Sequence, residues 1–309
     1  MLPPLLFHPL PQQRVWGGRR LAQLYGRELP SGEPIGESWE ISDRPGAVSV
    51  IANGPLAGHD LRWLMENQAA DLLGDVPSAD GRFPWLFKIL DAAETLSLQV
   101  HPPPGFPEGE PKTEAWYVAD ATNDAHLFAG LRSGITRAQF REQLESGQLE
   151  TCIPRVPLSA GDAMFLPSGR LHALGGGTLV FEIQQNSDTT YRVFDWNRTG
   201  LDGRPRELHV DQAMAAIDFN DTEPPLAPAE GNPRTIADAP DLFKVEQHIL
   251  SAGSTLELSA GLQVVAVVTG ALEMGNLTLA PGDHCLLPAC LGPVRLRANS
   301  DTTLLLTCQ

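Results

Sequence analysis

Hydrophobic residues occur mostly in short runs separated by turn-forming residues, and this pattern predicts a chain of many strands. Within the runs, apolar side chains are contiguous or alternate with polar ones, which is typical of β-strands. The runs are AVSVIA (47–52), TLSLQV (95–100), AWYVA (115–119), AMFLP (163–167), TLVFEIQ (178–184), LQVVAVVTG (262–270) and TTLLLT (302–307). Residues 59–74, 136–146 and 209–218 instead space apolar residues as helices do. The expected fold class is therefore all-β, meaning mainly β with helical insertions.

A weak internal repeat indicates two related β units. The segment AGDAMFLPSGRLHAL (160–174) resembles PGDHCLLPACLGPV (281–294), and both contain G-D-x-x-x-L-P followed by a short turn. A Gly-Asp turn leading into such a strand is repeated in double-stranded β-helix barrels. The alternative is a common hairpin that occurs twice. Eleven residues after the Gly the first copy has His172 and the second has Pro293, so a ligand at His172 would have no counterpart.

Proline and glycine divide the chain further. The 309 residues include 27 Pro and 29 Gly, which break or weaken helices and favour strands and turns. Residues 221–241 are rich in Pro and poor in large apolar residues, as linkers are. We therefore expect an N-terminal domain at 1–220, a linker at 221–241 and a small C-terminal β domain at 242–309.

The charge balance limits the kinds of partner. The chain has 22 Lys+Arg and 38 Asp+Glu, a formal net charge of −16. Nucleic acids and anionic membranes would repel such a surface, so neither is expected as a partner. No basic residue precedes the short apolar N-terminal stretch, no run approaches about 18 apolar residues, and the four cysteines form no disulfide framework. We expect a cytoplasmic protein with free thiols, a monomer or weak homo-oligomer.

Candidate metal ligands first emerge from one alternating strand. In LSLQVH (96–101) the period of two places Ser97, Gln99 and His101 on the same face. Glu114 follows thirteen residues after His101, and His172 precedes a Gly-rich turn. Two imidazoles, one carboxylate and one amide oxygen make a mixed site suited to Zn²⁺ or a similar ion. The alternatives are a solvated polar strand face for Gln99 and a loop histidine for His172.

A second charged group lies near these residues in the sequence. Glu182, Asp188 and Arg192 occur in FEIQQNSDTTYRV, and the Arg lies among apolar residues, where it needs a partner. Lys88 and Lys112 also stand out, because lysines are few in this acidic chain. Such a cluster is often a solvated rim. Cations beside a metal site would, however, suit an anionic substrate such as a sugar phosphate.

Taken together, these segments resemble type I phosphomannose isomerases of the short bacterial branch, within the cupin superfamily. The matching segments keep the family's order. They are GESWEIS (36–42), FPWLFKILDAAETLSLQVHP (83–102), PKTEAWYV (111–118), AGDAMFLPSGRLHALGGG (160–177), EIQQNSDTTYRVFDWNR (182–198) and RELHVDQA (206–213).

The resemblance implies a fold and a set of site residues. It implies two cupin-type β-barrel (jelly-roll) units, of which the C-terminal one is metal-free. It implies one divalent ion per subunit, usually zinc, held by the residues matching Gln99, His101, Glu114 and His172. Lys112, Asp188 and Arg192 match catalytic positions, and Lys88, Glu182 and Trp39 are expected to contact the substrate. The stretch between Glu114 and His172 is shorter than in longer members, so their large helical insertion is not carried over.

The implied reaction interconverts mannose 6-phosphate and fructose 6-phosphate through a cis-enediol, with a metal ion to stabilise the developing oxyanion. The base stays open among Lys112, which would need a lowered pKa, Asp188 and Glu182. Two other functions remain possible: a non-catalytic sugar-phosphate-binding cupin, and a metal cupin with other chemistry such as an Fe(II) oxygenase. The oxygenase would not need the pocket cations, and the binder would not need a complete ligand set.

Overall fold

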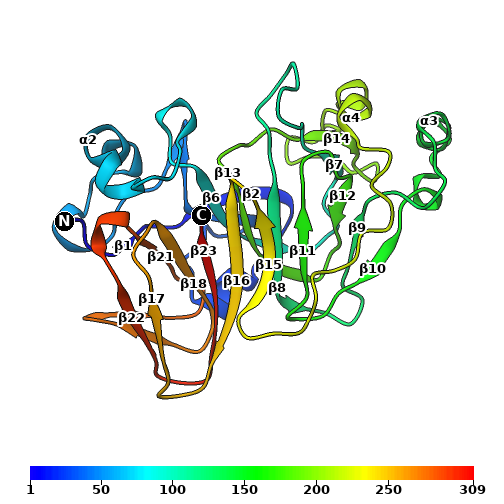
Figure 1. Ribbon diagram of the computed structural model, residues 1–309. Coiled ribbons are helices and arrows are strands. Elements are labelled where there is room, and N and C mark those ends of the chain that lie inside the picture. The colour runs from blue at the N-terminus through cyan, green and yellow to red at the C-terminus, as the bar shows by residue number, and fades with distance from the viewer.

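Two antiparallel sheets form the larger part of the protein, whose computed structural model describes residues 1–309 (Figure 1). The six-stranded sheet has the order β11 (Ala163–Leu166), β8 (Glu114–Ala121), β13 (Thr178–Gln185), β6 (Trp85–Ala92), β2 (Leu10–Gly18) and β3 (Ile35–Ile41), and β6 also pairs with β3. The five-stranded sheet has the order β10 (Arg155–Pro157), β9 (His126–Ala129), β12 (His172–Leu174), β7 (Leu98–Val100) and β14 (Tyr191–Phe194).

Two further sheets contain the C-terminal residues. One has the order β1 (Leu5–Leu6), β21 (His284–Leu287), β18 (Gln263–Thr269), β23 (Thr302–Cys308), β16 (Phe243–Leu250) and β15 (Arg234–Ala239). The other has the order β17 (Thr255–Leu258), β22 (Val294–Ala298), β19 (Leu272–Met274) and β20 (Leu277–Leu279). A small hairpin joins β4 (Asp43–Arg44) to β5 (Ala47–Val48). The chain's first strand, β1, thus pairs with β21 near its end.

The helices are short and lie outside the sheets (Figure 1). They are α1 (Arg20–Tyr25), α2 (Leu61–Leu73), α3 (Arg137–Glu145) and α4 (Val210–Ala216), with 3₁₀ turns at Gly54–Leu56, Ala79–Gly81, Leu149–Thr151 and Ala289–Leu291. The sequence signals that start the longer helices are present. The Asp60 side chain accepts from the Trp63 backbone N–H at the start of α2, and Thr136 forms a capping box with Gln139 at the start of α3.

The mainly β class is confirmed, and most expected elements are found close to their predicted positions. The predicted helices correspond to α2, α3 and α4, and six of the seven predicted runs contain a strand of three or more residues. The run at 47–52 forms only the two-residue β5, which pairs with β4, and two isolated bridges. The segment 221–241, predicted to be a linker, contains strand β15, which pairs with β16. No helix is long and apolar enough to cross a membrane.

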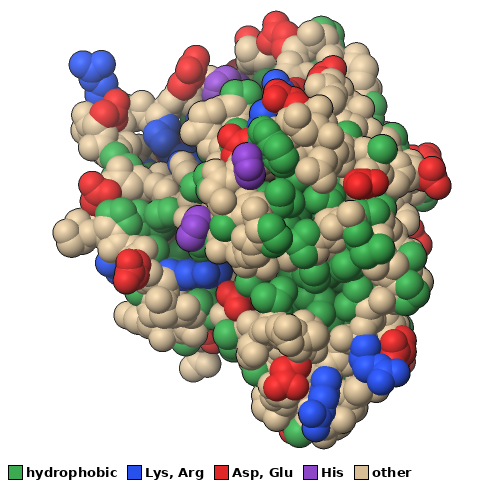
Figure 2. All heavy atoms as spheres, turned by 90° about the vertical axis from the view of Figure 1, so that its left-hand side faces the viewer, with side chains coloured by type: hydrophobic (Ala, Val, Ile, Leu, Met, Phe, Trp, Pro, Cys, Tyr) green, Lys and Arg blue, Asp and Glu red, His purple; other side chains and the backbone are tan.

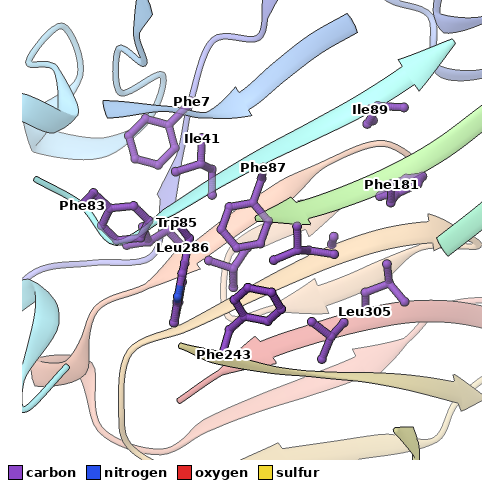
Figure 3. Packing of buried hydrophobic residues seen from close by; sticks show 14 of the residues in the cluster. Phe7, Ile41, Phe83, Trp85, Phe87, Ile89, Phe181, Phe243, Leu286 and Leu305 are labelled. Atoms are coloured by element: carbon purple, nitrogen blue, oxygen red, sulfur yellow. The ribbon is translucent and has the colours of Figure 1, made fainter. Parts of the chain in front are cut away.

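Period-two alternation in the six-stranded sheet separates two buried faces. Phe87 and Ile89 of β6 and Phe181 of β13 pack against Phe243 and Leu305 of the C-terminal sheet, in one core shared by both parts (Figure 3). The intervening residues of the same strands face the five-stranded sheet, where a second core fills the space between the two sheets. The charged residues Lys88 and Glu182 occupy this second face, opposite each other in register. Strand alternation therefore directs these charged side chains toward the five-stranded sheet. The opposite face of the same strands packs against the C-terminal part.

On the side of the molecule shown in Figure 2, acidic and basic side chains lie scattered among hydrophobic ones. All four cysteines are free thiols.

Glu40 of β3 lies where the N-terminal and C-terminal parts of the chain meet, and its protonation should affect stability. Its carboxylate accepts from Ser38 Oγ (2.6 Å) and from Arg27 Nη2 (2.9 Å), and Arg27 also donates to the Gly282 carbonyl of the C-terminal part. Burial raises the pKa of Glu40 from 4.5 to about 7, against the opposing effect of Arg27. Because the folded state holds this proton more tightly than the unfolded state, stability falls as pH rises from about 4.5 to about 7.

Glu40→Gln should remove this pH dependence. Urea unfolding at pH 5 to 8 should show the wild type losing up to about 3 kcal/mol relative to the variant over this range. The difference between the two proteins is the informative quantity, since His284, whose burial lowers its pKa to about 3, titrates in both with the opposite sign. Parallel stability profiles would contradict the assignment.

Candidate metal centre

Four polar side chains converge where the two N-terminal sheets meet. Gln99 of β7 and His172 of β12 are register partners in the five-stranded sheet, and His101 follows the end of β7. Glu114 is the first residue of β8 in the facing sheet. Its Oε1 lies 3.2 Å from His172 Nε2, and its Oε2 lies 3.5 Å from His101 Nε2. The ligand atoms of His101, Glu114 and His172 all lie within 4.8 Å of one another.

The donor atoms of this cluster fit a divalent cation. His101 Nδ1 donates to the Thr189 carbonyl (2.8 Å) and His172 Nδ1 donates to the Arg170 carbonyl (2.9 Å), which leaves both Nε2 lone pairs facing Glu114. Glu114 Oε1 and His101 Nε2 are buried without a hydrogen-bond partner, whereas Glu114 Oε2 is contacted by a neighbouring ammonium. Buried polar atoms rarely lack partners, so two such atoms at one point indicate a cation-binding site.

Gln99 completes the mixed donor set that the sequence predicts. Its Nε2 lies 3.3 Å from His172 Nε2, while its Oε1 accepts from Ser97 Oγ (3.2 Å). For Gln99 to supply an oxygen ligand, its amide group must rotate so that Oε1 and Nε2 exchange places. The two ends of the amide have a similar shape, which allows this rotation. Two imidazoles with one carboxylate, and no thiolate, suit zinc and related ions.

The protonation states of the cluster favour metal binding. Burial, reinforced by the ammonium of Lys112, lowers the pKa of His101 to about 3, so its imidazole is neutral near pH 7. Burial alone would raise the pKa of Glu114, but the ammonium of Lys112 holds it well below its usual range. Lys112 Nζ lies only 2.7 Å from Glu114 Oε2. Burial opposes the charge of Lys112, yet Glu114 and Glu182 raise its pKa, which is the reverse of the lowered pKa that a base at this position would need.

A cavity of about 640 Å³ lies beside the cluster and contains most of the predicted pocket residues. Gln99 and Lys112 form its wall next to the ligands, and the other predicted residues on the lining are Lys88, Glu182, Asp188 and Arg192. Trp39 does not line the cavity. It is buried behind Lys88, whose Nζ lies 5.1 Å from the centroid of the Trp39 ring.

The cavity-lining side chains differ in how far they are already neutralised. Lys88 Nζ lies 3.2 Å from Glu182 Oε1, so this pair is matched. Arg192 Nη1 donates to the Glu207 carbonyl (2.7 Å), its Nε is buried without a partner, and it forms no ion pair. Asp188 is exposed to the cavity and also forms no ion pair. Arg192 and Asp188 are therefore the predicted residues whose charges remain available to a ligand.

Arg14 and Glu37 are among the lining residues that were not predicted from the sequence. Arg14 Nε and Nη2 donate to the two oxygens of Glu37 (2.9 and 3.1 Å). Glu37 lies in IGESWEI (35–41), where every residue is buried. A glutamate in a continuous buried strand needs a cationic partner. The glutamate within this hydrophobic run was therefore the signal in the sequence that could have identified Glu37 as a paired residue. The identity of the partner depends on strand pairing between β2 and β3.

Comparisons with known proteins agree on one group of enzymes. Residues 5–104 match the catalytic domain of phosphomannose isomerase type I. A mannose-6-phosphate isomerase of Streptococcus mutans is 34% identical over 93% of both chains, and a probable mannose-6-phosphate isomerase of Bacillus subtilis is 35% identical over 97% of this chain and 98% of its own length.

Solved structures extend the similarity to the whole fold. The crystal structure of a mannose 6-phosphate isomerase from Bacillus subtilis has 31% sequence identity and a TM-score of 0.88, covering 100% of both chains. A zinc-bound holo structure of a mannose 6-phosphate isomerase has 19% identity and a TM-score of 0.76 over 99% of both chains, which shows a shared fold.

Proposed function

Because this chain belongs to the type I phosphomannose isomerase family, we propose that it interconverts mannose 6-phosphate and fructose 6-phosphate through a cis-enediol. The observation that carries this proposal is a pair of buried ligand atoms without a hydrogen-bond partner, His101 Nε2 and Glu114 Oε1, beside a cavity with cationic side chains. An aldose–ketose isomerisation needs an electrophile near the oxygens on C1 and C2, an acid–base group near these two carbons, and a residue that binds the phosphate.

We propose that Gln99, His101, Glu114 and His172 hold one zinc ion per subunit. The bound cation would act as a Lewis acid toward the oxygens on C1 and C2 of the sugar. Lys112 is buried against Glu114 and carries its proton, so it donates a hydrogen bond to the oxygen on which negative charge develops. This role does not require the lysine to lose its proton.

Asp188 is the group to which we assign the carbon-bound proton. It lines the cavity and forms no ion pair, whereas Glu182 accepts from Trp116 Nε1 and contacts two lysines. A carboxylate without such partners can take a proton from C2 and return it to C1 on the same face of the enediol. Glu182 is then left to orient cations and sugar hydroxyls.

Arg192 is the residue to which we assign the phosphate. Arg192→Ala should raise KM for mannose 6-phosphate roughly 10- to 100-fold, because a guanidinium–phosphate contact is a charge-assisted, commonly bidentate interaction. Steady-state kinetics test this, and Arg192→Lys should restore part of the affinity. Arg141→Ala, which removes an exposed arginine on α3 paired with Asp211, serves as the matched control. An unchanged KM in Arg192→Ala would refute the assignment.

The function itself is tested by a coupled assay that follows conversion of mannose 6-phosphate to fructose 6-phosphate. Activity should disappear after exhaustive chelation and return when zinc is added. Absent activity in the zinc-loaded protein that still binds the sugar phosphate would indicate a non-catalytic binding protein. Activity untouched by chelation would refute the metal-dependent reaction.

The proposal extends to the domain architecture, the cellular location and the oligomeric state. We infer two cupin-type β-barrel units, an N-terminal catalytic domain at 1–220 and a metal-free C-terminal domain at 242–309. The space between the two C-terminal sheets is filled by buried apolar side chains, including Leu258, Val265 and Leu296, which supports a unit without a site. We further infer that the protein is cytoplasmic and a monomer or weak homo-oligomer.

A further inference from the structure

A row of alternating charges crosses the wall of the cavity from its outer end to the metal cluster. Neighbouring strands supply its six members, which run in the order Arg14 (β2), Glu37 (β3), Lys88 (β6), Glu182 (β13), Lys112 (just before β8) and Glu114 (β8). The successive closest N–O distances are 2.9, 4.0, 3.2, 3.9 and 2.7 Å. Arg14 has a 29% exposed side chain, and those of the other five are at most 11% exposed. Three cations and three anions balance within this row.

Lys88 depends on both of its neighbours in the row. Its ammonium is buried, and a buried charge without adequate partners costs several kcal/mol. Glu182 is the nearer anionic neighbour, but its Oε1 atom, 3.2 Å from Lys88 Nζ, also lies 3.9 Å from Lys112 Nζ. Glu37 Oε2, at 4.0 Å, is the second anionic neighbour of Lys88. Without Glu37, Glu182 would be the only carboxylate within 4.0 Å of Lys88 Nζ.

Glu37 is itself held firmly in place. Arg14 binds both of its oxygens, and Trp39 Nε1 donates to its Oε2 at 2.6 Å. Burial alone would raise the pKa of Glu37, yet Lys88 and Arg14 lower it to about 2. The carboxylate is therefore ionised and fixed in orientation, and its charge acts on Lys88 from the side opposite Glu182.

We propose that Arg14 and Glu37 are positioning residues that direct Lys88 toward sugar hydroxyls in the cavity. This inference rests on the proposed function, because the ligand is a hexose phosphate. Lys88 lies two strands away from the residue pair Lys112 and Glu114, so it contacts a part of the sugar remote from the reacting carbons. An interaction that is equal in the ground and transition states changes KM rather than kcat.

Glu37→Gln should therefore raise KM for mannose 6-phosphate about tenfold and change kcat less than about threefold, as expected for one charge-assisted contact. Calorimetric binding of mannitol 6-phosphate, which lacks the carbonyl and cannot isomerise, should weaken by a similar factor. Glu40→Gln is the matched control, since Glu40 is a buried, arginine-paired glutamate on the opposite face of the same strand. It should leave KM and kcat unchanged.

A double-mutant cycle separates positioning from general damage. In a Lys88→Met background, Glu37→Gln should have little further effect on KM, because the group that it positions is gone. Effects that multiply independently, or a Glu37→Gln variant that behaves like Glu40→Gln, would overturn the inference while leaving the isomerase activity of the wild type intact. An inactive wild type would instead overturn the proposed function.

Discussion

His101→Ala should abolish turnover and metal retention together. Three of the four proposed ligands converge on one point, and the substitution removes the imidazole whose Nε2 is buried without another partner. The remaining carboxylate, imidazole and amide leave the ion one ligand short and hold it less tightly. We expect kcat/KM to fall at least about a thousandfold, and zinc content to fall from about one per chain to near zero.

Elemental analysis of the purified protein and the coupled assay measure the two effects. His126→Ala provides the control, because His126 is a partly exposed histidine on β9 that lies outside the ligand cluster. That variant should keep both its zinc and its activity. A His101→Ala protein that retained one zinc per chain and turned over normally would show that the metal lies elsewhere.

Lys112→Met should produce the second largest loss, but with the metal still bound. The ammonium lies 2.7 Å from Glu114 Oε2 and lines the cavity, where it is placed to donate to an oxygen that gains charge in the reaction. Removing one such donor typically costs 10²–10³ in kcat, so we expect a loss of about that size. Zinc content should be unchanged, because loss of a neighbouring positive charge does not weaken cation binding.

The comparison of kcat with zinc content distinguishes this role from a structural one. Lys112 also neutralises two buried carboxylates, so the metal-free variant should be less stable than the metal-free wild type, by about 3–5 kcal/mol. Lys244→Met, which removes a 40% exposed lysine paired with Glu246, should change neither activity nor stability appreciably. A Lys112→Met enzyme with kcat within about threefold of the wild type would refute the donor role.

The predicted residues that belong to one strand were placed correctly relative to one another because alternation is a local property. The pattern around 96–101 put Gln99 and His101 on one face, and the structure brings both beside His172. Glu114 and His172 were candidates that the resemblance also matched to ligand positions, and they come from a different sheet and a distant strand. The roles of these residues remain predictions until variants are measured.

The sequence by itself determined the mainly β class, the three longer helices and the faces on which the candidate ligands lie, because these follow from periodicity and capping over a few residues. Only the tertiary structure decided which strands are neighbours. That pairing joins Arg14 to Glu37 and Glu37 to Lys88, inserts β15 into the predicted linker and unites both parts of the chain in one core. It also brings Glu182 within 3.9 Å of Lys112, so that a residue far away in sequence adds to the effect of Glu114 in raising the pKa of Lys112 against burial.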